Sequence, residues 1–299
     1  MAMRNFPNGL TRLRRLTMRN DFAVFILSHG RANRVITVDT LRRCGYTGDI
    51  YIIIDDMDSD EGEYRKRYGD KVIMFNKRAE AERSDVMDMD DDMRIVLYAR
   101  NACHRIAKEL GLTYFLELDD DYNKFCFRKE KNGGLSSTYM SHLDMVFDAF
   151  IDFLEVSGAV TVAMAQGGDF IGGIGSNVWK RQLSRKAMNS FFCKTDRPFQ
   201  FLGRINEDVN AYTLLSSRGK LFFTVARAML NQMTTQTNEK GLTDVYLKYG
   251  TYVKSFYTVM AMPSAARVQM LNTAHKRVHH KILWDRCTPM IISDRYKKA

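Results

Sequence analysis

The chain has 299 residues and a mass of 34.6 kDa, which suits about two domains of typical size or one large α/β unit with appendages. Hydrophobic residues make up 45% and charged residues 27%, so a disordered or fibrous chain is excluded. The longest apolar runs are too short to span a bilayer, and residues 1–20 lack the apolar stretch of a secretory signal. We therefore expect a cytoplasmic protein with no membrane partner. Five cysteines without CxxC spacing argue against a disulfide framework or a structural zinc site, and we expect them to be reduced.

Positive charge is concentrated at the two ends. Residues 1–20 contain five arginines and no acid, and residues 267–299 contain eight Lys or Arg against two Asp. The two ends together carry a charge of +11. Because the net charge of the whole chain is +10, the middle of the chain carries −1. Basic ends on a near-neutral body suggest a rim that binds a polyanion, although tails that only keep the protein soluble are the alternative. The apolar content of the C-terminal segment indicates a packed or docking element.

The first part of the chain is predicted to alternate strand and helix, in the order strand 22–27, helix 35–43, strand 50–54, helix 64–68 and strand 72–75. Alternation of this kind predicts βαβ units, an α/β fold and a mainly parallel sheet. The acidic stretch at 80–92 follows. We expect it to be a mobile surface loop, because it lacks the glycine turn of a calcium site.

The second part continues the pattern with helix 94–110, strand 114–118, helix 140–155, strand 159–165, helix 207–217 and strand 221–225. The helix at 94–110 has its apolar positions on one face, and Gly111 supplies its stop. Asn206 is expected to cap the helix that starts with Glu207 and Asp208.

Three consecutive aspartates follow the apolar strand at 114–118. Ligands of open α/β sheets bind beyond the carboxyl ends of the strands, so Asp119, Asp120 and Asp121 are expected to face a site. Because side chains alternate in extended backbone, Asp119 and Asp121 would point one way and Asp120 the other. Adjacent carboxylates repel one another unless a cation lies among them, and oxygen ligands suit Mg²⁺ or Mn²⁺. The alternative is a solvated turn, since Asp is common in turns.

Polar residues also follow the first two strands. Asp55 and Asp56 could accept hydrogen bonds from a base or a ribose, or could simply cap the next turn. Ser28, His29 and Arg31 could cradle a phosphate. The sequence contains no GxGxxG and no GxxxxGK[ST], which disfavours dinucleotide and P-loop chemistry.

Two further pairs could take part in catalysis or metal binding. Glu207 or Asp208 could act as a general base toward an acceptor hydroxyl. Alternatively, both could only stabilise the helix N-terminus through the helix dipole. His279 and His280 are adjacent and cannot point the same way in a helix or strand, so at most one of them is expected to bind an ion. A structural role is the alternative for both.

Four segments together resemble the nucleotide-binding half of GT-A glycosyltransferases: SHGR at 28–31, IDD at 54–56, ARNA at 99–102 and LDDD at 118–121. With Asn206-Glu207-Asp208 downstream, residues 22–283 are similar to the phage-encoded TET-associated glycosyltransferases. Those enzymes are predicted to attach sugars to hydroxymethylated pyrimidines in DNA. The resemblance therefore implies a double-stranded DNA partner and, for a phage protein, the host-cell cytoplasm.

The resemblance implies a GT-A-like, Rossmann-type mixed sheet flanked by helices. The expected division is a basic extension over 1–20, a catalytic domain over 21–266 and a basic element over 267–299. Within the catalytic domain, residues 21–125 would bind the nucleotide sugar and residues 126–266 the acceptor.

For the site, the resemblance implies a UDP-sugar donor and a Mn²⁺ or Mg²⁺ cofactor. Asp119 would contact the donor ribose and the ion, Asp120 would lie at the donor, and Asp121 would bind the ion. Asp55 or Asp56 would read the uracil ring, and Arg100 would lie near the donor. Asp208, or its neighbour Glu207, would be the base of an inverting transfer, and His279 or His280 would complete the metal sphere.

Three other functions stay open from the sequence. The same acids would serve a nucleotidyltransferase that acts on a nucleoside triphosphate. A glycosyltransferase could instead use a glycan or protein acceptor, with the positive charge incidental. A DNA-binding accessory protein with a degenerate site is the non-enzymatic alternative.

Overall fold

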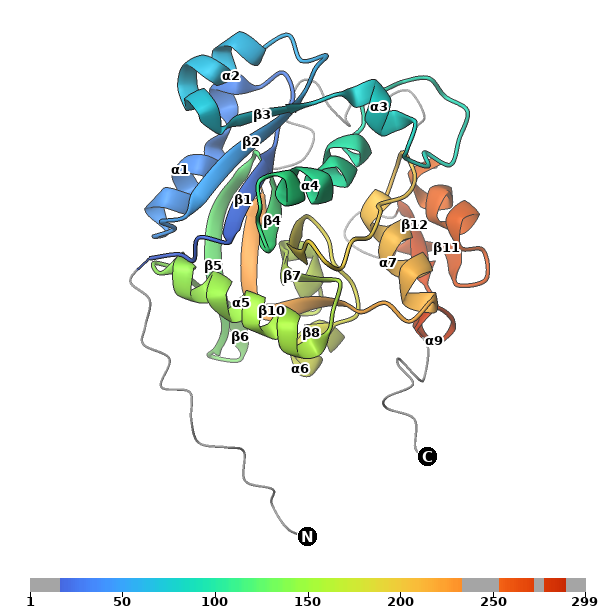
Figure 1. Cartoon of the computed structure of the whole chain (residues 1–299). Helices are drawn as coiled ribbons and strands as arrows, with labels where there is room; N and C mark the ends of the chain where they lie inside the picture. The colour runs from blue at the N-terminus through green and yellow to red at the C-terminus, as the bar shows by residue number, and fades with distance from the viewer. Residues whose placement is uncertain (1–16, 233–252, 272–276, 289–299) are drawn as a thin grey trace, which may run out of the picture.

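A computed structural model describes residues 17–232, 253–271 and 277–288 of the chain (Figure 1). The strands of its main sheet are β1 (Phe22–Leu27), β2 (Asp49–Asp55), β3 (Val72–Phe75), β4 (Tyr114–Asp119), β5 (Tyr122–Lys131), β6 (Gly134–Tyr139), β7 (Thr161–Ala165), β8 (Leu183–Ser184), β9 (Ser190–Lys194) and β10 (Phe222–Gln232). A separate hairpin consists of β11 (Ala266–Leu271) and β12 (Arg277–Ile282).

The α-helices are α1 (Ile36–Arg43), α2 (Glu61–Tyr68), α3 (Lys77–Ala81), α4 (Leu97–Glu109), α5 (Leu143–Ser157), α6 (Asn177–Arg181), α7 (Glu207–Ser217) and α9 (Trp284–Cys287). Residues 253–261 are also helical. Single 3₁₀ turns occur at Ala32–Arg34, Gly69–Lys71, Gly167–Phe170 and Gly173–Gly175.

The main sheet is mixed, in the order β3-β2-β1-β4-β9-β7-β10-β5-β6, with β8 paired to β10. The four strands β3, β2, β1 and β4 are parallel to one another. β1 lies in their middle and is buried at every position, because a central parallel strand is covered on both faces. The predicted α/β fold class, a mixed sheet flanked by helices, is confirmed. The single sheet continues through both predicted halves of the catalytic domain, so their division at residue 125 stays a prediction.

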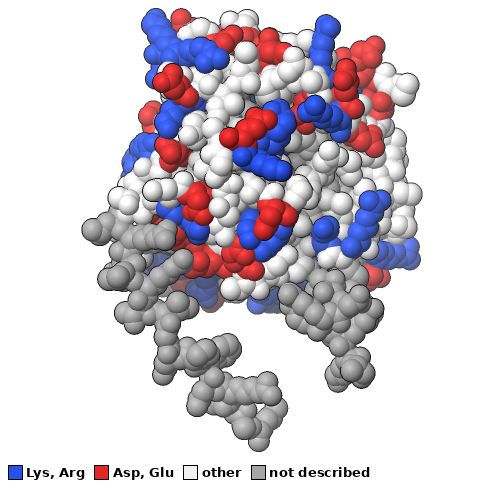
Figure 2. Space-filling view, in the orientation of Figure 1, with Lys and Arg blue, Asp and Glu red and all other residues white. Residues whose placement is uncertain are grey.

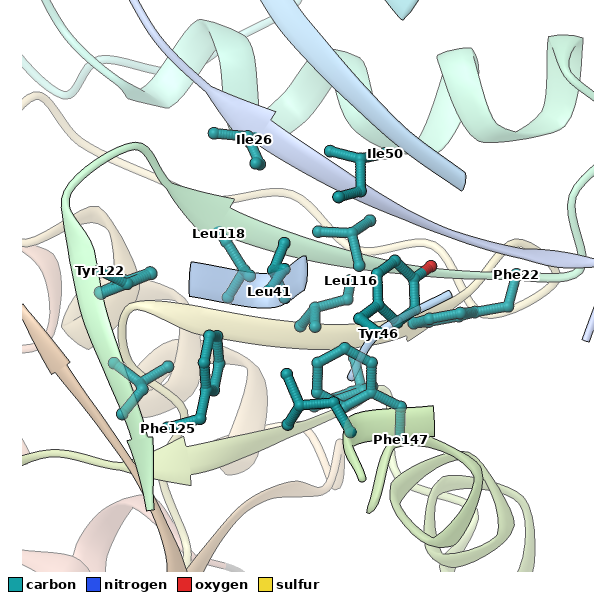
Figure 3. Packing of buried hydrophobic residues seen from close by; sticks show 14 of the residues in the cluster. Phe22, Ile26, Leu41, Tyr46, Ile50, Leu116, Leu118, Tyr122, Phe125 and Phe147 are labelled. Atoms are coloured by element: carbon teal, nitrogen blue, oxygen red, sulfur yellow. The ribbon is translucent and has the colours of Figure 1, made fainter. Parts of the chain in front are cut away.

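Helices cover both faces of the sheet, and each face has its own hydrophobic core. On one face, α1 and α5 pack on Phe22, Leu116 and Phe125, with Phe147 of α5 at the centre of the aromatic contacts (Figure 3). On the other face, α4 and α7 pack against β1, β4 and β9. Since side chains alternate along a strand, β4 directs Leu116 to the first core and Glu117 to the face that α4 covers.

Beyond β4 the sheet mixes parallel and antiparallel pairs, and the apolar pattern did not predict the strands β5, β6, β8 and β9. β9 is antiparallel to both β4 and β7, and β5 pairs with β6 in a hairpin. Asn132 and Gly133 form the turn of this hairpin with φ of 52° and 72°, as a tight two-residue turn requires. The strand predicted at 221–225 runs on to Gln232, because β10 leaves β7 and continues along β5.

The described part of the predicted C-terminal element is folded. It forms the β11–β12 hairpin and α9, and the ring of Trp284 stacks on Tyr212 of α7 with centroids 5.8 Å apart. Most of the predicted N-terminal extension lies outside the described residues. All five cysteines are free and buried, at positions 44, 103, 126, 193 and 287. In the described ranges, no helix has the length and apolar content needed to cross a membrane.

The acidic stretch at 80–92 is anchored, which corrects the expectation of a mobile surface loop. Arg204 is 2% exposed; it donates to both oxygens of the Asp88 carboxylate and to the backbone carbonyls of Asp90 and Asp92. The hydroxyl of Tyr257, from the helix at 253–261, also donates to Asp88, at 2.5 Å. A basic side chain more than a hundred residues away therefore neutralises Asp88 and anchors the backbone at Asp90 and Asp92.

Arg204→Ala should lower the free energy of unfolding by about 2–4 kcal/mol, because it leaves a carboxylate and two carbonyls without their donor. The loss stays below that of a fully enclosed ion pair, since the Asp88 side chain is 23% exposed. Chemical denaturation would measure it, with Arg78→Ala on the exposed side of α3 as the control. A loss equal to that of the control would contradict this role for Arg204.

Candidate active site

The carboxyl ends of β1, β2 and β4 meet at one edge of the sheet, because the three strands are parallel neighbours. Asp120 is 1% exposed there. Its Oδ2 accepts a hydrogen bond from Ser28 Oγ at 2.5 Å and lies 3.3 Å from Nε of Arg31. Burial raises the pKa of Asp120 to about 6, although Arg31 acts in the opposite direction. Asp120 therefore joins β4 to the loop after β1.

Asp121 has one satisfied and one unsatisfied oxygen. Its Oδ2 accepts a hydrogen bond from Nε2 of Gln232 at 3.1 Å, whereas its buried Oδ1 has no hydrogen-bond partner among the described residues. Burial, and then the charge of Asp119, raise the pKa of Asp121 to about 7. A buried oxygen that lacks a donor, beside a second carboxylate, suits an oxygen-preferring divalent cation.

Asp119 lies between α4 and β5. Its Oδ1 accepts from Nη2 of Arg100 at 3.1 Å, and its Oδ2 accepts from the hydroxyl of Tyr122 at 3.2 Å. The side chain is 21% exposed. The alternation expected from the sequence is present for Asp119 and Asp120, since the first turns toward α4 and the second toward Ser28 and Arg31.

The two aspartates after β2 have different surroundings. Asp55 is 5% exposed, and its Oδ2 lies 2.8 Å from Nδ1 of His29 and 3.2 Å from Nζ of Lys77. Burial acts against ionisation, but His29 and Lys77 outweigh it and lower the pKa of Asp55. Asp56 accepts from the backbone N–H of Lys77 and from Asn76, and so organises the start of α3. The capping alternative therefore describes the observed contacts of Asp56.

The first turn of α7 contains Glu207 and Asp208, which are 7% and 8% exposed. Asn206 occupies the N-cap position with φ of 57°, but its side chain makes no cap hydrogen bond. Its amide donates to the carbonyl of Lys254 at 2.7 Å, so Asn206 joins α7 to the helix at 253–261. Burial, and then the charge of Glu207, raise the pKa of Asp208 to about 7. Asp208 is thus a carboxylate that can exchange a proton near neutral pH.

Arg100 lies inside the protein at 2% exposure, between the aspartates of β4 and the acids of α7. Its Nε donates to Oε1 of Glu207 at 3.1 Å, and its Nη2 donates to Asp119. The arginine expected near the donor is therefore enclosed by protein carboxylates.

The two histidines lie on β12, where His280 is opposite Val268 and His279 opposite Gln269. Their ring centroids are only 4.2 Å apart, which corrects the expectation that adjacent histidines on a strand point apart. Burial, and then His279, lower the pKa of His280 to about 4, so His280 is neutral at physiological pH. Within the described ranges, no three His, Cys, Asp or Glu side chains come together as a metal-binding group. The structure thus does not gather Asp119, Asp121 and a histidine into one closed ligand set, and the histidine ligand stays a prediction.

The segment that contains these acids matches a known protein family. A family model for TET-associated glycosyltransferases covers residues 22–241, which is well over half of the chain. The chain belongs to this family. It is therefore a glycosyltransferase, and the matched residues include the ends of β1, β2 and β4 and the first turn of α7.

Solved glycosyltransferases resemble this family member only distantly. Glucosyl-3-phosphoglycerate synthase from Mycobacterium tuberculosis, in complex with Mn²⁺ and UDP-glucose, is 9% identical with a TM-score of 0.45, over 87% of this chain and 86% of that one. A mannosyltransferase from Pyrobaculum calidifontis, in complex with GDP-mannose and Mn²⁺, is 10% identical with a TM-score of 0.46, over 75% and 59%. No curated protein matches the sequence. Similarity this low assigns neither donor nor metal to this glycosyltransferase.

The site of this glycosyltransferase contains three residues that the sequence reading missed. Gln232 holds Asp121, and the hydroxyl of Tyr64 lies 2.7 Å from Ser28 Oγ. Glu117 is fully buried 3.9 Å from Arg100, and burial raises its pKa to about 8. Glu117 had a sequence signal, because a charged residue inside the apolar run YFLEL has to find a partner or lose its charge.

Proposed function

We propose that this glycosyltransferase transfers a sugar from a UDP-sugar to the hydroxymethyl group of a modified pyrimidine in double-stranded DNA. The family match over residues 22–241 carries the proposal. Members of this family are predicted to modify hydroxymethylated pyrimidines, and the hydroxymethyl group of such a base offers a hydroxyl that can attack a sugar. The basic ends of the chain support a nucleic-acid partner.

The donor diphosphate would bind at the carboxyl edge of β1 and β4, with Asp121 and Asp119 as the protein ligands of a Mn²⁺ or Mg²⁺ ion. The unpartnered Oδ1 of Asp121 supports this assignment, as does the all-oxygen donor set. A cation bound there offsets the negative charge that develops on the departing diphosphate. Asp120, Ser28 and Arg31 would keep this edge in place through the contacts described above.

The donor base would bind over the end of β2. The oxygens of Asp55 already accept from His29, Lys77 and the backbone N–H of Met57, so this carboxylate has little capacity left for a base. The His29 side chain is 43% exposed. We therefore propose that His29 contacts the uracil ring and that Asp55 orients the His29 side chain.

Asp208 would be the general base. As the hydroxymethyl oxygen attacks the anomeric carbon, its proton passes to the carboxylate of Asp208, the bond between that carbon and the diphosphate breaks, and UDP leaves. A single displacement of this kind inverts the anomeric configuration. Access to the hydroxymethyl group would require the base to leave the helical stack, at a cost of a few kcal/mol.

The rate of transfer should rise with pH through about 7, because burial and Glu207 keep Asp208 protonated below its raised pKa. Below that value only the ionised fraction can accept a proton, so the rate should fall about tenfold per pH unit. Arg100 and Lys254 act in the opposite direction on the same carboxylate. Single-turnover rates between pH 5 and 9 would measure the profile. A rate independent of pH below 7 would argue against Asp208 as the base.

DNA contacts are assigned to the basic ends, because acidic and basic side chains are interspersed over the face of the body seen in Figure 2. Arg12, Arg14 and Arg15 lie outside the described residues. Replacing all three with Ala should reduce the slope of log affinity against log salt by about 3, since each neutralised phosphate contributes about 0.9. Fluorescence anisotropy with duplex DNA would measure the slope. An unchanged slope would show that these three arginines do not contact the DNA phosphates.

The proposal is tested by incubating the protein with hydroxymethylated DNA and a panel of nucleotide sugars, then digesting the DNA to nucleosides. The expected result is a nucleoside heavier by one sugar residue, with UDP released in equal amount. If the nucleosides stay unmodified while sugar is transferred to a glycan or protein acceptor, the DNA acceptor is wrong and the alternative acceptor is correct.

A further inference from the structure

Arg100 is surrounded by three carboxylates from three different parts of the chain. Its Nε lies 3.1 Å from Glu207 of α7, its Nη2 lies 3.1 Å from Asp119 at the end of β4, and its Nη1 lies 3.9 Å from Glu117 within β4. The guanidinium carbon also lies 5.0 Å from the ring centre of Phe191 and 5.7 Å from that of Phe201. Only 2% of the surface of Arg100 is exposed, and the hydrogen bonds of its Nε and Nη2 go to protein carboxylates, while its buried Nη1 makes no hydrogen bond among the described residues.

The two hydrogen-bonded carboxylates serve opposite sides of the proposed reaction. Asp119 is on the donor side, next to Asp121. Glu207 is on the acceptor side, next to the proposed base Asp208. They are 88 residues apart in sequence and on different elements, and Arg100 donates to both. A planar guanidinium can donate along two fixed directions at once, which an ammonium on a flexible stem cannot reproduce.

We propose that Arg100 is a positioning residue that fixes the donor-side carboxylate Asp119 relative to the acceptor-side pair Glu207 and Asp208, without contacting donor or acceptor. The inference rests on the proposed function, because that function places the donor at Asp119 and the acceptor at Glu207 and Asp208. It replaces the expectation, drawn from the resemblance, that Arg100 lies at the donor.

The consequence is a specific effect on the chemical step. Displacement of a reacting group by about 1 Å is enough to slow a reaction by about 10²-fold, even when ligands still bind. Arg100→Lys keeps the positive charge in its buried place, but its ammonium lacks the rigid planar fork that holds the two carboxylates at a fixed separation. The variant should therefore still bind the donor, but the general base Asp208 should no longer be aligned with the donor.

The first experiment compares Arg100→Lys with Arg105→Lys, a control on the same helix whose side chain is 40% exposed and pairs with Glu109. Calorimetry with UDP and Mn²⁺ gives donor-site affinity, and single-turnover assays on hydroxymethylated DNA give the transfer rate. Arg100→Lys should keep UDP affinity within about 3-fold and lose about 10²-fold in transfer rate. The control should match the wild type.

Two results would overturn the inference. An unchanged transfer rate would show that alignment does not depend on Arg100, and a loss of UDP affinity as large as the loss of rate would show that Arg100 acts on donor binding rather than on the alignment of the two sides. Failure of the proposed function itself is distinct, because the wild-type protein would then modify no hydroxymethylated DNA.

Glu207 provides a second comparison if Arg100→Lys does not fold. Glu207→Gln keeps an oxygen that accepts from Nε of Arg100, whereas Glu207→Ala removes it. The inference predicts that the Gln variant transfers at least about 10-fold faster than the Ala variant at equal UDP affinity. Equal rates for the two variants would contradict it.

Discussion

Asp121→Ala should abolish metal-dependent turnover, with a loss of about 10³-fold or more, on the order of 4 kcal/mol. The substitution removes the carboxylate whose Oδ1 lacks a partner, and with it the site to which we assign the divalent cation. Steady-state rates across a Mn²⁺ titration would measure the effect: wild-type activity should saturate with the metal, and the variant should stay near background throughout.

The same substitution should not destabilise the metal-free protein. Burial and the nearby Asp119 already disfavour the charge of Asp121, as its raised pKa indicates, so thermal unfolding without metal should be unchanged or shifted upward. Asp196→Ala is the control, because that carboxylate is 61% exposed and pairs with Lys194 on the surface. A variant that folds and retains Mn²⁺-dependent activity would exclude Asp121 as a metal ligand.

Asp208→Asn should remove transfer and leave donor binding intact. The amide keeps the shape of the side chain and an oxygen for the backbone N–H of Val209, but it cannot take a proton from the acceptor hydroxyl. Loss of a general base typically costs about 10²–10⁴-fold in rate. Single-turnover transfer and UDP calorimetry, performed on the same preparation, would separate the two effects.

Two outcomes would contradict this role of Asp208. Retained transfer would show that another group accepts the proton, and the neighbouring Glu207 would then be tested by the same substitution to Gln. A fall in stability with no specific loss of transfer would indicate that Asp208 serves only the first turn of α7, which was the structural alternative in the sequence.

The sequence was sufficient for the parts of the fold in which the local pattern decides the outcome. β1 is apolar at every position because both of its faces are covered, and such a run can be recognised without knowing its neighbours. Gly111 was predicted to end the long helix, and it has φ of 70° directly after Leu110, the C-cap of α4. The edge at Asp119, Asp120 and Asp121 followed from strand polarity alone.

Contacts between distant segments could not be predicted in this way. The pairing of Arg204 with Asp88 spans 116 residues, and that of Arg100 with Glu207 spans 107. No local pattern records which buried cation meets which acid, so Arg100 was expected at the donor, and the acids near Asp88 were expected to be mobile. The short strand β9 was missed because its apolar run, FFC at 191–193, is only three residues long.

In the proposed function, the carboxyl edge of β1, β2 and β4 binds a nucleotide diphosphate together with a divalent cation. Crystals grown with UDP and Mn²⁺ would test it most directly through anomalous scattering recorded at the manganese edge. We expect an anomalous peak within coordination distance of the Asp121 carboxylate, with the UDP diphosphate on the same ion and the uracil ring near His29. UDP bound elsewhere, or at this edge with no peak beside Asp121, would contradict it.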